Sequence, residues 1–157
     1  MTPTVPSDLF RLVYRSRSAL EGSAAEVQRA VETLVSASRD RNQAAGVTGA
    51  LLFARRHFVQ ALEGPAPAVE AIFDRICCDL RHTGVEVVEC GPVLEQAFGK
   101  APLSHLVPDA EASAVLDGLD RATECVDTAA AAMRLMLALL RPAERDRAAL
   151  RPAAGQV

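Results

Sequence analysis

Two primary amides and one phenol stand out in this chain because each falls on an otherwise apolar face. Gln60 lies between Phe58 and Leu62 at the spacing of one strand face, and Asn42 continues an apolar helical stripe. Tyr14, the only tyrosine, falls on the inward side of an alternating segment. A buried polar group without a partner costs about 1–3 kcal/mol, so these side chains require polar neighbours. Together they predict a polar pocket inside the core.

Each of these residues also has a purely structural interpretation. Tyr14 fits a core tyrosine whose hydroxyl donates to a backbone carbonyl. Ser38 and Asn42 fit polar residues at the fraying end of a helix. The pocket hypothesis depends on these side chains and Gln60 all turning inward from separate elements.

A second polar group lies at the end of the later helical pattern. Arg75, Asp79 and His82 are spaced at i, i+4 and i+7, which places them along one edge of a helix. The structural alternative is a solvated ladder, in which an Arg75–Asp79 pair contributes about 0.2–0.5 kcal/mol.

The elements that position these residues follow from periodicity and turn signals. Ser23 and Glu26 form a capping box that opens a helix running to about Ala44, and Pro65 opens a second helical stripe that extends to Leu80. The predicted strands are Leu9–Ser16, Val47–Ala54, His57–Glu63 and Val85–Cys90, with a last strand between Phe98 and Leu103 that Pro102 restricts to an edge. Arg55 and Arg56 occupy the hairpin turn, where glycine is preferred.

This order predicts an α+β fold: a ferredoxin-like sheet with two helices on one face and a C-terminal helical extension on the other. We expect one domain over residues 8–104, the extension over 105–141, and a mobile tail over 142–157. The extension contains a stripe between residues 115 and 126 and a second formed by Met133, Met136, Leu137 and Leu140. Such stripes predict a helical cover for the sheet or an interface in a homodimer.

Composition and motifs exclude several classes of function. The 157 residues carry a formal net charge of −3, which provides no field for nucleic acid or anionic membrane. The sequence has no G-x-S-x-G, Walker, G-x-G-x-x-G or H-E-x-x-H motif, and its histidines and cysteines lack metal-site spacing. We therefore expect neither an enzyme nor a metal site.

The compartment is expected to be the cytoplasm. The N-terminus lacks the charged and apolar regions of a signal peptide. The longest apolar run, residues 129–140, is interrupted by Arg134 and is too short to span a bilayer.

Several separated segments resemble the BLUF domains, blue-light sensors that hold FAD. The matching pieces are Leu12-Val13-Tyr14-Arg15-Ser16, Asn42 through Gly49, Phe58 through Gly64, and Asp79-Leu80-Arg81-His82. They cover about residues 8–100. The resemblance implies a flavin, FAD with FMN possible in its place, held between the two helices.

The resemblance also implies roles for individual residues. Asn42 would hold the pyrimidine edge of the flavin, and Gln60 would bridge Tyr14 to its N5 and O4 side. The resemblance implies that Arg41, Arg75 and Asp79 would contact the ring or ribityl chain. Arg81 and His82 would approach the sugar and phosphate, and Ser38 would anchor the glutamine. Light would drive electron and proton transfer from Tyr14, and Gln60 would then rotate or tautomerise.

The chain departs from the family after Phe98, where relatives usually carry a tryptophan and a methionine thought to relay the signal. Here the segment is Lys100-Ala101-Pro102-Leu103. The resemblance implies a photoreceptor that signals through an unidentified partner protein or through its own oligomer. The alternatives are a flavin-free interaction module of the same fold and a small acylphosphatase-like hydrolase.

Overall fold

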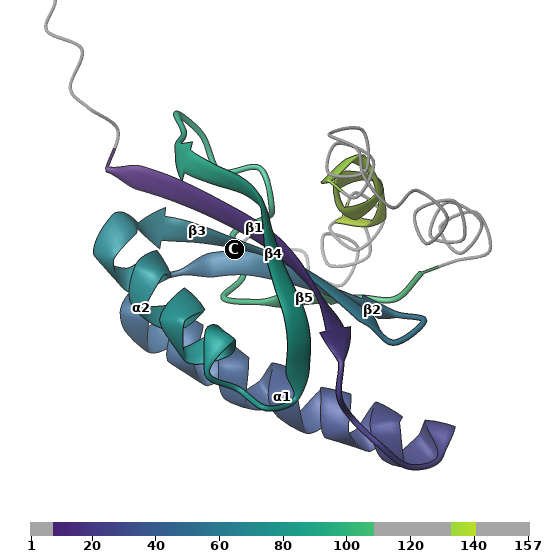
Figure 1. The fold of residues 1–157 in the computed structure, drawn as a ribbon. Coiled ribbons are helices and arrows are strands. Elements are labelled where there is room, and N and C mark those ends of the chain that lie inside the picture. Colours follow the sequence, from purple (N-terminus) through teal and green to yellow (C-terminus); the bar gives the residue numbers. More distant parts are fainter. Residues whose placement is uncertain (1–7, 109–132, 141–157) are drawn as a thin grey trace, which may run out of the picture.

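The computed structural model describes residues 8–108 and 133–140 of the chain. Its ordered elements are β1 (Leu9–Ser18), α1 (Ala24–Ala45), β2 (Thr48–Ala54), β3 (His57–Pro65), α2 (Ala66–Cys77), β4 (His82–Pro92) and β5 (Ser104–Leu106). They form a five-stranded sheet in the order β4-β1-β3-β2-β5, with only β5 parallel to its neighbour. Helices α1 and α2 cover one face, and the helical segment 133–140 lies on the other (Figure 1). The α+β ferredoxin-like prediction is confirmed.

Local sequence signals explain the boundaries of α1. Ser23 accepts a hydrogen bond from the Glu26 amide, and the Glu26 carboxylate accepts one from the Ser23 amide, which completes the predicted capping box. The helix ends at Gly46, whose φ of 69° is the left-handed conformation that glycine adopts without steric cost.

Helix α2 is shorter than its apolar stripe predicts. It ends at Cys77, and Leu80 is 91% exposed instead of continuing the buried face. The Asp79 carboxylate accepts hydrogen bonds from the backbone and side chain of Arg81, a local arrangement that competes with helical hydrogen bonding. The predicted helical ladder of Arg75, Asp79 and His82 is therefore wrong, since Asp79 follows the helix and His82 begins β4.

The last strand also differs from its prediction. The segment from Phe98 to Leu103 is not a strand, and β5 begins only at Ser104. Pro102 has no amide hydrogen to donate to a ladder, and its carbonyl oxygen instead accepts a hydrogen bond from Asn42. The expected edge position is confirmed, because β5 lies at the end of the sheet beside β2.

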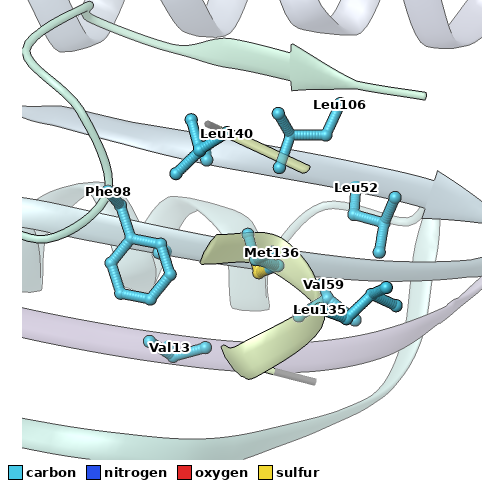
Figure 2. Packing of buried hydrophobic residues seen from close by; sticks show 10 residues of the cluster. Val13, Leu52, Val59, Phe98, Leu106, Leu135, Met136 and Leu140 are labelled. Atoms are coloured by element: carbon cyan, nitrogen blue, oxygen red, sulfur yellow. The ribbon is translucent and has the colours of Figure 1, made fainter. Parts of the chain in front are cut away.

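The far face of the sheet is covered as the C-terminal stripe predicts. Met136 and Leu140 are buried against Val13, Phe98 and Leu106. Figure 2 shows these side chains together with Leu52, Val59 and Leu135. Leu135 belongs to the same helical segment but was not in the predicted stripe. Arg134, which interrupts the apolar run, is exposed. The stripe between residues 115 and 126 and the tail lie outside the described residues, so the domain boundaries stay predictions.

Candidate functional site

Tyr14 and Gln60 face each other from the two central strands. They are register partners of β1 and β3, with exposed fractions of 0% and 4%. The Tyr14 hydroxyl donates a hydrogen bond to Oε1 of Gln60. Burial raises the pKa of Tyr14, and the negative charge of Asp79 raises that pKa further. The phenol therefore stays protonated and acts as a donor to the amide.

A pocket opens beside this pair, between α1 and α2. Its lining residues are Ser38, Arg41, Asn42, Gln60, Ile72, Arg75, Ile76 and Asp79. Six of the nine residues predicted for the site thus meet at one place, and the other three are Tyr14, Arg81 and His82. Tyr14 is connected to the pocket by its hydrogen bond to Gln60. The free space in the pocket measures about 30 Å³.

Asn42 connects the pocket to the segment before β5. Its side chain lies in the last turn of α1 and is 1% exposed. Its Nδ2 donates to the carbonyl oxygen of Pro102 at 2.8 Å. The amide thus joins the pocket to the segment where this chain departs from the family pattern.

Polar side chains surround the pocket opening. Arg41 and Arg75 are exposed, and Arg41 Nη2 donates to the Ser38 hydroxyl at 3.4 Å. Ser38 lines the same pocket as Gln60. That Ser38 anchors the Gln60 side chain stays a prediction. The opening therefore combines two cations with a hydroxyl, an arrangement suited to the polar parts of a ligand.

Asp79 and Arg81 form a bidentate ion pair at the end of this pocket. Arg81 Nη2 lies 2.6 Å from one carboxylate oxygen, and Nε lies 2.9 Å from the other. The hydrogen bonds from Arg81 hold the pKa of Asp79 at about 2, well below its usual value. Asp79 lines the pocket, whereas Arg81 is not among its lining residues. Arg81 therefore acts on the pocket through Asp79.

His82 occupies the core behind Tyr14 and does not line the pocket. Its Nδ1 lies 2.8 Å from the Ser16 hydroxyl, and its ring centroid lies 4.4 Å from that of Phe58. Burial lowers the pKa of His82, so the neutral imidazole is favoured. Its predicted contact with sugar or phosphate would require it to leave this packing.

Sequence reasoning assigned no site role to several residues of this region. Ile72 and Ile76 line the pocket, although their spacing indicated only core packing. Ser16 shares the inward face of β1 with Tyr14, and that shared face was the available signal for its contact with His82.

Comparisons with known proteins place this arrangement in a family. The family model described as sensors of blue-light using FAD, BLUF, matches residues 9–104. The chain is 39% identical over 93 residues to the blue light- and temperature-regulated antirepressor BluF of Escherichia coli (strain K12), covering 59% of this chain and 22% of that protein. It is 35% identical over 98 residues to photoactivated adenylate cyclase subunit beta of Euglena longa, covering 62% and 11%. The chain therefore spans less than a quarter of the length of these two relatives.

Solved structures agree with the sequence relatives. The dark-state structure of BlrB, a BLUF protein, is 30% identical and superposes with a TM-score of 0.66, covering 85% of this chain and 98% of that one. The region that the family model matches, residues 9–104, contains β1 to β4, both helices and the Tyr14–Gln60 pair of this chain. The chain belongs to the BLUF family of blue-light sensors that use FAD.

Proposed function

We propose that this chain senses blue light through a flavin held between α1 and α2, with Tyr14 and Gln60 as the photochemical pair. The hydrogen bond from the Tyr14 hydroxyl to Gln60 Oε1 is the observation that carries the proposal. It joins a buried, protonated phenol to an amide that lines the pocket. Bound FAD would supply the absorption of blue light and the oxidising power of its excited state.

Two unsatisfied atoms of the pocket fit the flavin. Among the residues that the structure describes, Gln60 Nε2 and Asn42 Oδ1 have no hydrogen-bond partner, although both side chains are buried. Native proteins rarely leave such atoms unpaired. One donor and one acceptor from separate amides suit a ring edge that carries carbonyls, an imide and a basic nitrogen.

The space beside these amides must widen for a ring. A cavity of about 30 Å³ holds water but no ring system. We expect the exposed side chains of Arg41 and Arg75 to move aside, since both line the pocket and extend into solvent. Ser38, Asp79, Arg81 and His82 remain proposed contacts, and those of Arg81 and His82 require larger movements than the others.

The chain's own contribution is to hold and redirect one proton. In the starting state, Tyr14 holds the proton and Gln60 accepts the hydrogen bond at Oε1. Rotation of the Gln60 amide exchanges its oxygen and nitrogen, so a donor replaces the acceptor opposite Tyr14. The oxygen then faces the pocket, which changes the hydrogen bonding offered to the ligand there.

The output of this signal is also a proposal. The BluF relative is named as an antirepressor, and other relatives are named as adenylate cyclases. We propose that this chain performs no turnover and signals through a partner protein or a homodimer. The rival hypotheses, a flavin-free module and a small hydrolase, have no comparable support from relatives. None of the described helices is long and apolar enough to cross a bilayer, and a cytoplasmic location stays a prediction.

Two substitutions test the photochemical pair. Tyr14→Phe preserves packing and removes the transferable proton, and Gln60→Leu removes the amide. Both variants are expected to keep flavin and lose the light-induced red shift of the absorption spectrum. Thr33→Ala provides the control, because it removes an exposed hydroxyl from the same helix at a residue that does not line the pocket. A normal red shift in either pair variant would show that the photocycle does not use this hydrogen bond.

A further inference from the structure

A second pocket lies at the opposite end of the hairpin from Gly64, around the turn between β2 and β3. We call it the turn pocket; its lining residues are Arg17, Ser18, Ala19, Leu20, Glu21, Arg55, Arg56 and His57. It measures about 400 Å³, within the range of small-molecule sites. It shares no lining residue with the pocket between α1 and α2. The photochemical site therefore does not account for it.

Backbone hydrogen bonds fix the walls of the turn pocket. The Ser18 amide donates to the Arg56 carbonyl oxygen at 2.7 Å, and the Ala19 amide donates to the Arg81 carbonyl oxygen at 2.8 Å. The Ser18 hydroxyl accepts from the Leu20 amide at 3.1 Å. The segment that follows β1 is thus tied both to the hairpin turn and to the start of β4, which preorganises the pocket.

The charge of the turn pocket is opposite to that of the whole chain. Three arginines and one glutamate leave a formal surplus of two positive charges, whereas the full chain carries −3. His57 adds an imidazole to the lining. Arg17 has no ion-pair partner within residues 8–108 and 133–140, so its guanidinium is available to a ligand.

The backbone of the turn supplies an independent observation. Arg55 and Arg56 have φ angles of 51° and 64°, the left-handed region that side chains disfavour. Two-residue hairpin turns of this kind normally use asparagine and glycine. Arginine at both positions is conformationally unfavourable, and such unfavourable conformations concentrate at functional sites.

We propose that the turn pocket binds a small phosphate-bearing anion. Guanidinium groups bind phosphate through paired, charge-assisted hydrogen bonds, and arginine is the residue best suited to that geometry. The pocket volume accommodates a phosphate ester with an organic group attached. The phosphate comes either from a free phosphorylated compound or from the tail of the flavin dinucleotide.

The test is a titration of the FAD-loaded full chain with inorganic phosphate, in which backbone amide NMR shifts are measured at each phosphate concentration. Saturable shifts are expected at Ser18, Arg56 and His57, and sodium chloride at matched ionic strength is expected not to reproduce them. Arg17→Gln and Arg56→Gln are each expected to weaken binding by about tenfold or more. Arg29→Gln, an exposed arginine of α1 outside the pocket, is the matched control and is expected to bind like the unaltered chain.

Two further outcomes decide the proposal and the source of the phosphate. Non-saturable shifts in both the FAD-loaded and the riboflavin-loaded protein, or equal binding by both pocket variants and the unaltered chain, would overturn it. A repeat with riboflavin-loaded protein separates the sources: binding only in this form identifies the cofactor's own phosphates, and equal binding in both forms identifies a free anion. The titration needs no light response, so its failure is distinguishable from failure of the photochemical proposal.

Discussion

Glu63 provides the sharpest test of what holds the segment before β5 in place. Its carboxylate on β3 is fully buried, with an exposed fraction of 0%. Arg11 donates to it from Nε at 3.0 Å, and the amides of Ala97 and Phe98 donate at 3.0 Å and 2.7 Å. Arg11 also donates from Nη2 to the Glu95 carbonyl oxygen. One carboxylate thus joins the central sheet to the chain that leads into β5.

Glu63→Ala would leave Nε of Arg11 and two backbone amides without their acceptor, while Arg11 keeps its contacts with Glu89 and with the Glu95 carbonyl oxygen. Removing one partner of a buried ion pair costs about 3–5 kcal/mol. The Arg11 side chain is 12% exposed, so water recovers part of this loss and we expect about 3 kcal/mol. Glu63→Gln retains one acceptor oxygen and the side-chain shape, so about 1–2 kcal/mol is expected. Urea unfolding followed by circular dichroism measures both values.

The ion pair between Arg15 and Glu86 provides the matched control. Its atoms lie 2.8 Å apart on the same sheet, but the side chains are 32% and 62% exposed. Glu86→Gln should therefore cost less than about 1 kcal/mol. Faster hydrogen exchange at Ala97 and Phe98 in Glu63→Ala would locate the change. A cost for Glu63→Ala no larger than that for Glu86→Gln would refute the reasoning.

Three smaller predictions concern the turn and the titrating groups. Arg56→Gly should stabilise the chain by up to about 1 kcal/mol in urea unfolding, because relief of the left-handed conformation exceeds the entropy that glycine adds to the unfolded chain. Burial lowers the pKa of His82, so the free energy of unfolding should fall as pH drops below about 6.5. Burial also lowers the pKa of His105, which adds to this loss of stability. His82→Gln should therefore remove only part of the decline between about pH 7.5 and 5.5. The pKa of Asp79 is about 2, so the stability from its pair with Arg81 should be complete above about pH 4 and be lost as pH falls toward 2. Asp79→Asn should remove that dependence in an acid titration followed by circular dichroism.

Local sequence signals predicted the elements that hold the photochemical pair. Two signals depend only on residues close in the sequence: the capping box of Ser23 and Glu26, and the alternation of apolar and polar residues around Tyr14 and Gln60. The structure contains both the capped helix and the two strands. Tyr14 and Gln60 meet because β1 and β3 pair across the centre of the sheet, as the ferredoxin-like prediction requires.

Specific side-chain hydrogen bonds, one local and the others between distant residues, produced the errors. The end of α2 depends on the hydrogen bonds of Asp79 with Arg81, which compete with the apolar period that extends to Leu80. The position of β5 depends on Asn42, 60 residues from Pro102, and on Glu63, 35 residues from Phe98. Periodicity contains no information about these partners, so the sequence predicted an edge strand but not its residues.

The light-minus-dark absorption spectrum of the purified protein tests the central claim most directly. If the chain senses blue light through a flavin beside Tyr14 and Gln60, the protein is yellow and releases FAD on denaturation. Blue light then shifts its absorption slightly to the red, and the shift reverses in the dark. Protein that releases no flavin, or flavin-loaded protein whose spectrum illumination leaves unchanged, would contradict the account.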